Sequence, residues 1–182
     1  MAGADEFRVQ TPRLILRPFD PGDITDLVRI GRDPRVAPMM GSIPLDWSDD
    51  AARNWVARWP YRGTVGFRVA LQHRDGPLIG AAGLVGAPVS LNYFLDPAMW
   101  GQGLATEAAR GLLAGAFARF SGLDIVVADH FADNPASGRV LEKLGFVRMG
   151  TGAGRSLARL EPAPKIQYRL MRRTFEASHE IS

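Results

Sequence analysis

The chain has 182 residues, 46% of them apolar, which predicts a single domain over residues 1–182 with its core at about residues 10–173 and short polar tails. The sequence contains no cysteine, which excludes disulfides, thiolate metal ligands and a cysteine acyl-enzyme, and its three histidines lack the spacing of a metal site. The formal net charge is only +3 and the arginines are scattered, so we expect no nucleic-acid partner.

The first half of the chain predicts strands and two helices around one hairpin. Asp20 and Ser48 are expected N-caps, which place helices near residues 20–32 and 48–58. An Asp-Gly pair at residues 75–76, between two strand-like runs, is a strong hairpin signal. The runs expected to form strands in this half are residues 13–17, 67–72, 78–85 and 90–95.

The second half predicts helices that alternate with strands. Apolar residues at helical spacing indicate a helix over residues 104–120. A further helix is expected to begin after Asn134 as its N-cap, with Pro135 in its first turn and Gly145 at its end. The runs expected to form strands here are residues 125–130, 146–149 and 166–171.

These elements predict an α+β fold in α/β/α layers. A mixed, mostly antiparallel sheet of about seven strands is expected to carry helices on both faces, four in all. Glycine and proline residues at 150–154 and 161–164 mark a flexible crossing before the last strand, the part we expect to be most mobile.

The turn before the helix at residue 104 has the features of a phosphate site. Gly101 and Gly103 let the backbone approach a ligand, and the first amides of a helix lack internal partners and attract an anion. Thr106 adds a hydroxyl donor. A tight connection without a ligand is the alternative. The nucleotide-hydrolase loop is excluded, because no Gly-Lys-Ser/Thr follows, and the third glycine of a dinucleotide fingerprint is missing.

Residues 96–108 resemble the acetyl-CoA loop of the GCN5-related N-acetyltransferase (GNAT) superfamily. Gly103 and Ala105 match its two small positions, and Trp100 stands where the superfamily has Arg or Gln. The run Trp-Gly-x-Gly-x-Ala-Thr-Glu-Ala is similar to the branch of ribosomal-protein N-terminal (alanine/serine) acetyltransferases. Residues 134–146 resemble that branch's Asn-x-x-Ser helix ending in Gly-Phe, and the likeness spans about residues 10–173.

The resemblance implies an acetyl-CoA-dependent N-acetyltransferase that acts on a primary amine by direct transfer, with no metal. The backbone of Tyr93 and Leu95 is implied to hold the pantetheine arm and the thioester carbonyl. The other implied cofactor-binding residues are Trp100, Gly101, Gln102, Gly103, Leu104, Ala105, Thr106 and Asn134.

The resemblance also suggests the catalytic acid. The superfamily's tyrosine position is Leu141 here, so Ser137, which matches the branch's serine, is expected to stabilise the leaving thiolate. The alternative is that Ser137 only packs in the first helical turn. A Ser137→Ala substitution tests this role in single-turnover assays.

The general base stays open at the level of sequence, because residues 90–95 carry no carboxylate. The candidates are His130, Asp129, Glu161 and a water relay. Asp129 and His130 face opposite sides of a strand, so only one is expected to reach the cleft. His130 has the better pKa for the task, and Glu161 lies on the crossing where an amine would enter.

The acceptor amine is not specified by the resemblance. A protein N-terminal α-amine is one candidate, and a small amine, an amino acid or an antibiotic is the other. The missing tyrosine also permits a non-catalytic acyl-CoA-binding regulatory domain, and a structural interaction module is a third possibility. We expect a cytoplasmic monomer or homodimer without a membrane partner, because no apolar run spans a bilayer and residues 1–8 lack the apolar centre of a signal peptide.

Overall fold

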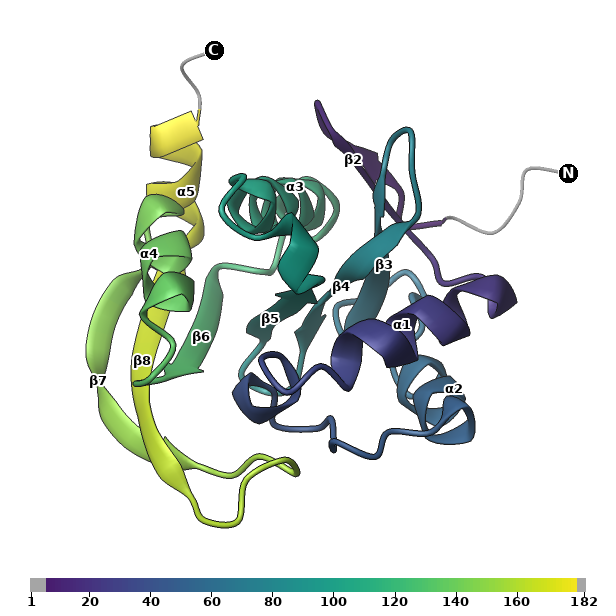
Figure 1. Cartoon of the computed structure of the whole chain (residues 1–182). Helices are drawn as coiled ribbons and strands as arrows, with labels where there is room; N and C mark the ends of the chain where they lie inside the picture. The colour runs from purple at the N-terminus through teal and green to yellow at the C-terminus, as the bar shows by residue number, and fades with distance from the viewer. Residues whose placement is uncertain (1–5, 180–182) are drawn as a thin grey trace, which may run out of the picture.

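A computed structural model describes residues 6–179 as one eight-stranded sheet with helices on both faces (Figure 1). The described residues do not include 1–5 and 180–182. The first of these ranges is part of the segment that is expected to lack a signal peptide. The strand order is β1-β2-β3-β4-β5-β6-β8-β7. The strands are β1 (Val9–Gln10), β2 (Leu14–Arg17), β3 (Phe67–His73), β4 (Leu78–Val85), β5 (Ser90–Leu95), β6 (Ile125–Phe131), β7 (Val147–Gly154) and β8 (Ala163–Met171).

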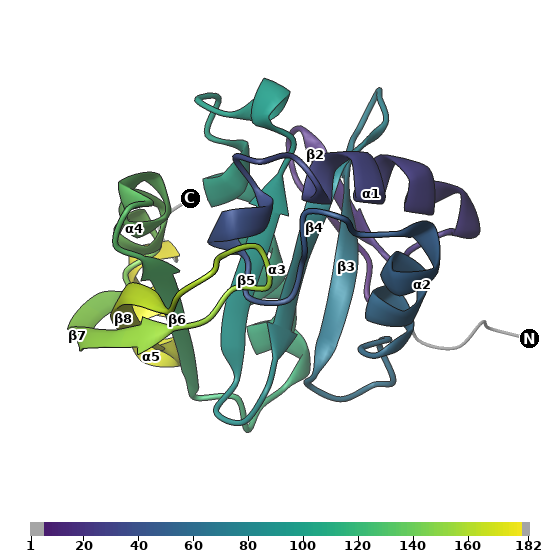
Figure 2. The same ribbon diagram turned by 60° about the horizontal axis from the view of Figure 1, so that its bottom comes forward.

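The helices form a layer on each side of the sheet (Figures 1 and 2). On one face, α1 and α2 enclose a core around Trp47 and Trp55, and on the other α3 and α4 cover a larger core. This arrangement confirms the predicted mixed, mostly antiparallel sheet between two helical layers. The helices are α1 (Ile24–Gly31), α2 (Asp49–Ala57), α3 (Leu104–Arg119), α4 (Pro135–Lys143) and α5 (Arg172–His179), with 3-10 turns η1 (Pro21–Asp23), η2 (Ala37–Met39) and η3 (Pro97–Met99).

Two elements differ from the sequence prediction at the C-terminal end. Residues 150–154, expected in a flexible crossing, form the second half of β7 and pair with the start of β8. Glycine permits this pairing because it has no Cβ. A Cβ at Gly154 would lie 2.5 Å from the Lys165 side chain of β8 and would clash with it. The expected polar tail after about residue 173 is instead part of α5, residues 172–179, because buried Phe175 packs against Phe117 with ring centroids 5.3 Å apart.

The sheet divides between β5 and β6, its only parallel neighbours among the described strands. Their register contains the single pair Ser90–Val127, and Val127 N donates to Val89 O over 2.9 Å. Beyond that pair the two strands separate (Figure 2), while each keeps a long antiparallel partner on its other side. The edge of β5 that faces β6 is therefore left open along most of its length.

Within the described part of the chain, none of the helices is both long and apolar enough to span a membrane.

Candidate active site

The predicted glycine turn lies at the open edge of β5 and leads directly into α3. Gly101 and Gly103 have φ values of 75° and 76°, the left-handed region that favours glycine. Gly103 is the N-cap and supplies no side-chain hydrogen bond, so the first amides of α3 remain available to a ligand. A Cβ at Gly101 would meet nothing within 4 Å, so the turn is open on that side. These features suit a phosphate group.

The turn is braced by Glu107 of α3, which binds the segment before β2. Thr11 Oγ1 donates to Glu107 Oε1 over 2.6 Å, and Arg13 Nε donates to Oε2 over 2.6 Å. Arg13 Nη1 also donates to Gln102 O over 2.8 Å, within the turn itself. Burial opposes ionisation of Glu107, but hydrogen bonds from Thr11 and Arg13 outweigh it and lower its pKa. The sequence shows no local signal for this brace.

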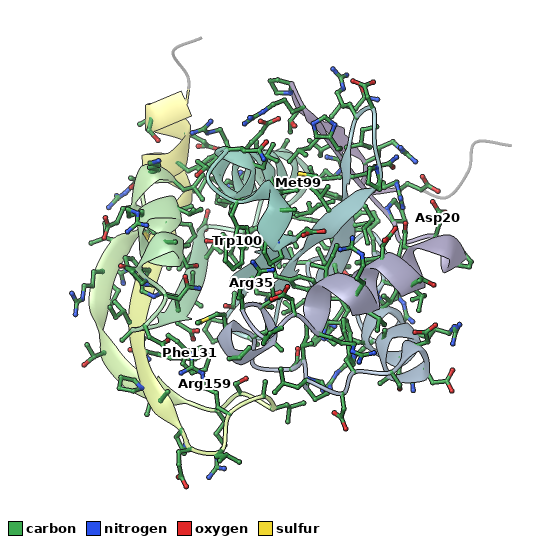
Figure 3. The ribbon with its side chains drawn as sticks, in the orientation of Figure 1. Asp20, Arg35, Met99, Trp100, Phe131 and Arg159 are labelled. Atoms are coloured by element: carbon green, nitrogen blue, oxygen red, sulfur yellow. The ribbon has the colours of Figure 1, made fainter. Side chains whose placement is uncertain are left out.

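Main-chain groups of β5 face the gap as the sequence predicts, with one difference. Because Val89 O points toward β6, alternation along the strand directs the main-chain groups of Leu91, Tyr93 and Leu95 to the same edge. Trp100 Nε1 donates to Leu95 O over 3.1 Å, so that carbonyl already has a partner. The Trp100 side chain lies at the N-terminal end of α3 (Figure 3), and the residue is 49% exposed.

Across the gap, α4 presents Ser137 to Tyr93. Asn134 caps this helix by accepting from Ser137 N over 3.4 Å, as its sequence predicts. The Tyr93 and Ser137 hydroxyl oxygens lie 2.9 Å apart. Burial raises the pKa of Tyr93 to about 12, only partly opposed by this hydrogen bond, so its hydroxyl stays protonated. From the sequence, only the backbone of Tyr93 was expected to take part, because strand alternation does not show which hydroxyl a side chain contacts.

The three candidate bases lie in different surroundings. His130 is buried under Gly138 of α4; its Nδ1 contacts Phe131 O at 2.7 Å, and its Nε2 has no hydrogen-bond partner among the described residues. Asp129 points to the opposite face, with its side chain 44% exposed and its carboxylate 2.7 Å from Lys165 Nζ. Glu161 is exposed in the segment between β7 and β8.

One cavity of about 900 Å³ joins most of these residues. It follows the gap between β5 and β6 from the glycine turn to the α1–α2 face of the sheet. Gln102 and Glu161 are not among its lining residues. The predicted residues that line it are Tyr93, Leu95, Trp100, Gly101, Gly103, Leu104, Ala105, Thr106, Asp129, His130, Asn134 and Ser137.

The far wall of the cavity is formed by the loop that contains η2, residues 36–42. The loop between β7 and β8, residues 155–162, closes against it (Figure 2). Buried Ser156 Oγ donates to Met40 O over 2.7 Å, and Arg159 Nε donates to Pro38 O over 2.7 Å. Arg159 also lies over the Phe131 ring at the end of β6 (Figure 3). These contacts join the two loops, and the mobility that the sequence predicts for this crossing stays a prediction.

Solved structures share this architecture. An acetyltransferase from Bacillus anthracis is 20% identical, with a TM-score of 0.75 over 91% of this chain and 98% of that one. A spermidine N-acetyltransferase from Vibrio cholerae, in complex with CoA and spermine, is 15% identical (TM-score 0.76; 91% and 99% covered). A ribosomal-protein-S5-alanine acetyltransferase from Vibrio fischeri is 17% identical (TM-score 0.70; 90% and 96%). At these identities the likeness concerns the fold.

Family membership comes from the sequence itself. The family described as acetyltransferase (GNAT) domain matches residues 13–147, which is more than half of the chain. The matched range contains the glycine turn, the open edge of β5 and the helix that carries Ser137. The chain is therefore an acetyltransferase that belongs to the GNAT family.

Proposed function

We propose that this acetyltransferase uses acetyl-CoA to acetylate a primary amine by direct attack, without an acyl-enzyme. The observation that carries the proposal is the single cavity that connects the start of α3 to the paired hydroxyls of Tyr93 and Ser137 along the open edge of β5. A thioester held along that edge would have its sulfur and carbonyl between β5 and β6. The amine would then approach it from the α1–α2 face of the sheet, opposite the glycine turn.

Three parts of the site fit acetyl-CoA. The uncapped amides of α3, the left-handed glycines 101 and 103 and the Thr106 hydroxyl suit its diphosphate. The outward main-chain groups of Tyr93 suit the amides of its pantetheine arm. The N–H of Leu95 can also donate to the pantetheine arm, because Trp100 forms its hydrogen bond with the Leu95 carbonyl. Acetyl-CoA supplies the thioester, and the chain supplies alignment and hydrogen bonds.

Ser137 and Tyr93 are placed to assist the leaving group. As the amine nitrogen bonds to the carbonyl carbon, the carbon–sulfur bond breaks and negative charge passes to sulfur. Either hydroxyl of this pair can be the donor. In the proposed step Ser137 Oγ–H donates a hydrogen bond to that sulfur, and the protonated Tyr93 hydroxyl turns to donate to Ser137 Oγ and polarises it. The substrate amine must lose a proton before attack. Asp129 is the candidate base that lies on the cavity and faces the acceptor side, with a water relay as the alternative.

The acceptor is a primary amine of one of two kinds, a protein N-terminus or a small molecule. The relatives named above include enzymes for each kind of amine, a ribosomal protein and a polyamine. A screen of intact proteins against a panel of small amines, read by acetyl incorporation, separates the two.

Calorimetry with acetyl-CoA and a CoA-release assay test the proposal. We expect binding by the natural protein and its loss, by at least about tenfold in Kd, in Gly103→Val, because that side chain strains a left-handed position and fills the phosphate site. Gly122→Val is the control, since nothing lies within 4 Å of its Cβ and its φ is not positive. Binding without CoA release by any amine would indicate a regulatory domain; absence of binding would contradict the proposal.

A further inference from the structure

Arg68 is a buried cation on the acceptor side of the cavity. It lies on β3 and is only 9% exposed, yet it is one of the residues that line the cavity. Its Nη1 donates to Trp55 O over 2.7 Å, and its guanidinium lies 3.7 Å from the centre of the Trp55 ring. Both contacts are to uncharged groups.

The described residues provide no carboxylate that pairs with Arg68. Its Nε is buried without any acceptor, and its Nη2 has no hydrogen bond to another described residue. Burial, together with the positive charge of Arg58, lowers its pKa to about 10. A buried charge is unfavourable unless it is paired, and such cations in proteins normally have an anionic partner. Arg68 is therefore a buried cation without an anionic partner among the described residues.

The strand register shows where that anion would lie. Arg68, Gly83 and Asn92 form one row across β3, β4 and β5. A Cβ at Gly83 would lie 2.9 Å from Arg68 Cγ and 3.3 Å from Asn92 Oδ1, so the Arg68 side chain and the Asn92 amide oxygen both border the space that glycine leaves. Asn92 also lines the cavity, on the face opposite the Tyr93 side chain.

The charge of the cavity agrees with an anionic ligand. Its lining contains five cationic residues and two acidic ones, and both acids already have basic partners in Lys165 and Arg159. A polyamine would meet the unpaired Arg68 charge on the acceptor side, whereas an acid group would neutralise it. The basic residues of the lining are Arg35, Arg68, Arg139, Lys143 and Lys165.

We propose that Arg68 binds a carboxylate of the acceptor, with Asn92 beside it, so that the natural acceptor is an amine that also carries a carboxylate, as a free amino acid does. This inference rests on the proposed acetyl transfer, because it concerns the second substrate of that reaction. The carboxylate would bind on the α1–α2 face of β3 to β5, and the amine would point into the gap between β5 and β6 toward the thioester.

Acetylation rates for matched acceptors test the inference. We compare the twenty amino acids with their α-amides, with polyamines, and with peptides that begin with Asp or Asn. The natural protein is expected to favour a carboxylate-bearing acceptor over its amide by about 10- to 100-fold in kcat/KM, the range of a hydrogen-bonded ion pair. A preference for the Asp peptides alone would place the carboxylate on a side chain rather than on a free amino acid.

The substitution Arg68→Met keeps packing over Trp55 but removes the charge. We expect it to lower kcat/KM for the acid by about 10- to 100-fold, to leave the amide unchanged, and to keep or raise the thermal midpoint, since an unpaired buried cation is removed. Arg53→Met is the control, because Arg53 is an exposed residue of α2 that pairs with Asp50 and does not line the cavity. Arg53→Met should leave kcat/KM unchanged for both the acid and the amide.

Two results would overturn the inference. One is a natural protein that prefers amides or polyamines; the other is an Arg68→Met variant that loses stability and slows every acceptor equally, which indicates a purely structural arginine. If no amine is acetylated, the proposed function fails, and calorimetry of N-acetyl amino acids on the CoA-loaded protein decides about Arg68 separately. Binding weakened by Arg68→Met supports the site, and equal or absent binding refutes it.

Discussion

At the scale of single residues, the proposed leaving-group side of the site combines two hydroxyls from different elements. Tyr93 comes from β5 and Ser137 from the first turn of α4, and they meet across the gap at 2.9 Å. Tyr93 keeps its proton, and either hydroxyl of the pair can be the donor; in the proposed arrangement Tyr93 donates to Ser137, which leaves the serine proton for the sulfur. Leu141, at the position where the resemblance implies a tyrosine, is buried in the core.

The substitution Tyr93→Phe should slow the acetyl-transfer step while acetyl-CoA binding stays nearly unchanged. We expect a loss of about tenfold in a single-turnover rate, because Ser137 then lacks its donor. Tyr93→Phe combined with Ser137→Ala should be no slower than Ser137→Ala alone, since the tyrosine acts through the serine. Fully additive losses would contradict this coupling.

The pH dependence of that rate offers a second check on Tyr93. With a pKa of about 12, the buried hydroxyl remains protonated when an ordinary tyrosine, with a pKa of 10.0, has begun to ionise. The single-turnover rate of the natural protein should therefore not fall at about pH 10 through ionisation of Tyr93. The natural protein and Tyr93→Phe should show the same pH profile there. Such a fall would mean that Tyr93 ionises in the ordinary range.

At the scale of elements, the glycine turn is positioned by a brace from a distant segment. Glu107 accepts hydrogen bonds from Thr11 and from both the main chain and the side chain of Arg13, and Arg13 in turn holds Gln102 O. The first turn of α3 is thereby attached to the segment before β2. A phosphate-binding turn that is held in place loses less entropy when it binds its ligand.

We expect Glu107→Gln to weaken acetyl-CoA binding by about 3- to 10-fold in calorimetry, because the Arg13 ion pair is lost while the size of the side chain is kept. The pKa of Glu107 is lowered in the folded protein, so its stabilisation is complete above the unfolded value of 4.5 and is lost as the pH falls through the folded value. Between about pH 5 and about pH 3, the free energy of unfolding should thus fall more in the natural protein than in the variant.

Asp26→Asn is the control for this pair of measurements, since the Asp26 side chain is 43% exposed and its one ion pair among the described residues is with Arg29 of the same helix. Equal acetyl-CoA affinity in Glu107→Gln and the natural protein would show that the turn keeps its shape without the brace.

Local sequence signals account for the elements that could be predicted. The start of α3 follows from Gly103, and the start of α4 follows from Asn134 and Pro135, because capping depends on adjacent residues. The second half of β7 was not predicted, because its glycines are typical of a loop and its strand conformation depends on pairing with β8. No local signal in the sequence indicates that Arg68 is buried. Its burial depends on Trp55 and on the space above Gly83, which only the packed fold brings together.

At the scale of the whole molecule, the divided sheet would give the two proposed substrates separate approaches. The glycine turn and α3 lie on one face, whereas the loop of residues 36–42 and the loop of residues 155–162 meet on the other. The second loop belongs to the β7–β8 hairpin beyond β6, and the first connects α1 and α2 over β3 to β5 (Figure 2). Their contact therefore bridges the two halves of the sheet across the acceptor side of the cavity.

Arg159 is the main link in that bridge. It donates to Pro38 O, pairs with both carboxylate oxygens of Asp133 at 2.9 Å and lies over Phe131. Arg159→Met should loosen both loops, raising KM for the acceptor by about 3- to 10-fold while the Kd of acetyl-CoA stays nearly constant. Hydrogen exchange should become faster in residues 36–42 and 155–160. Arg155→Met, an exposed change in the same loop, is the control. An equal loss of affinity for both substrates would instead mean that the bridge supports the whole gap between β5 and β6.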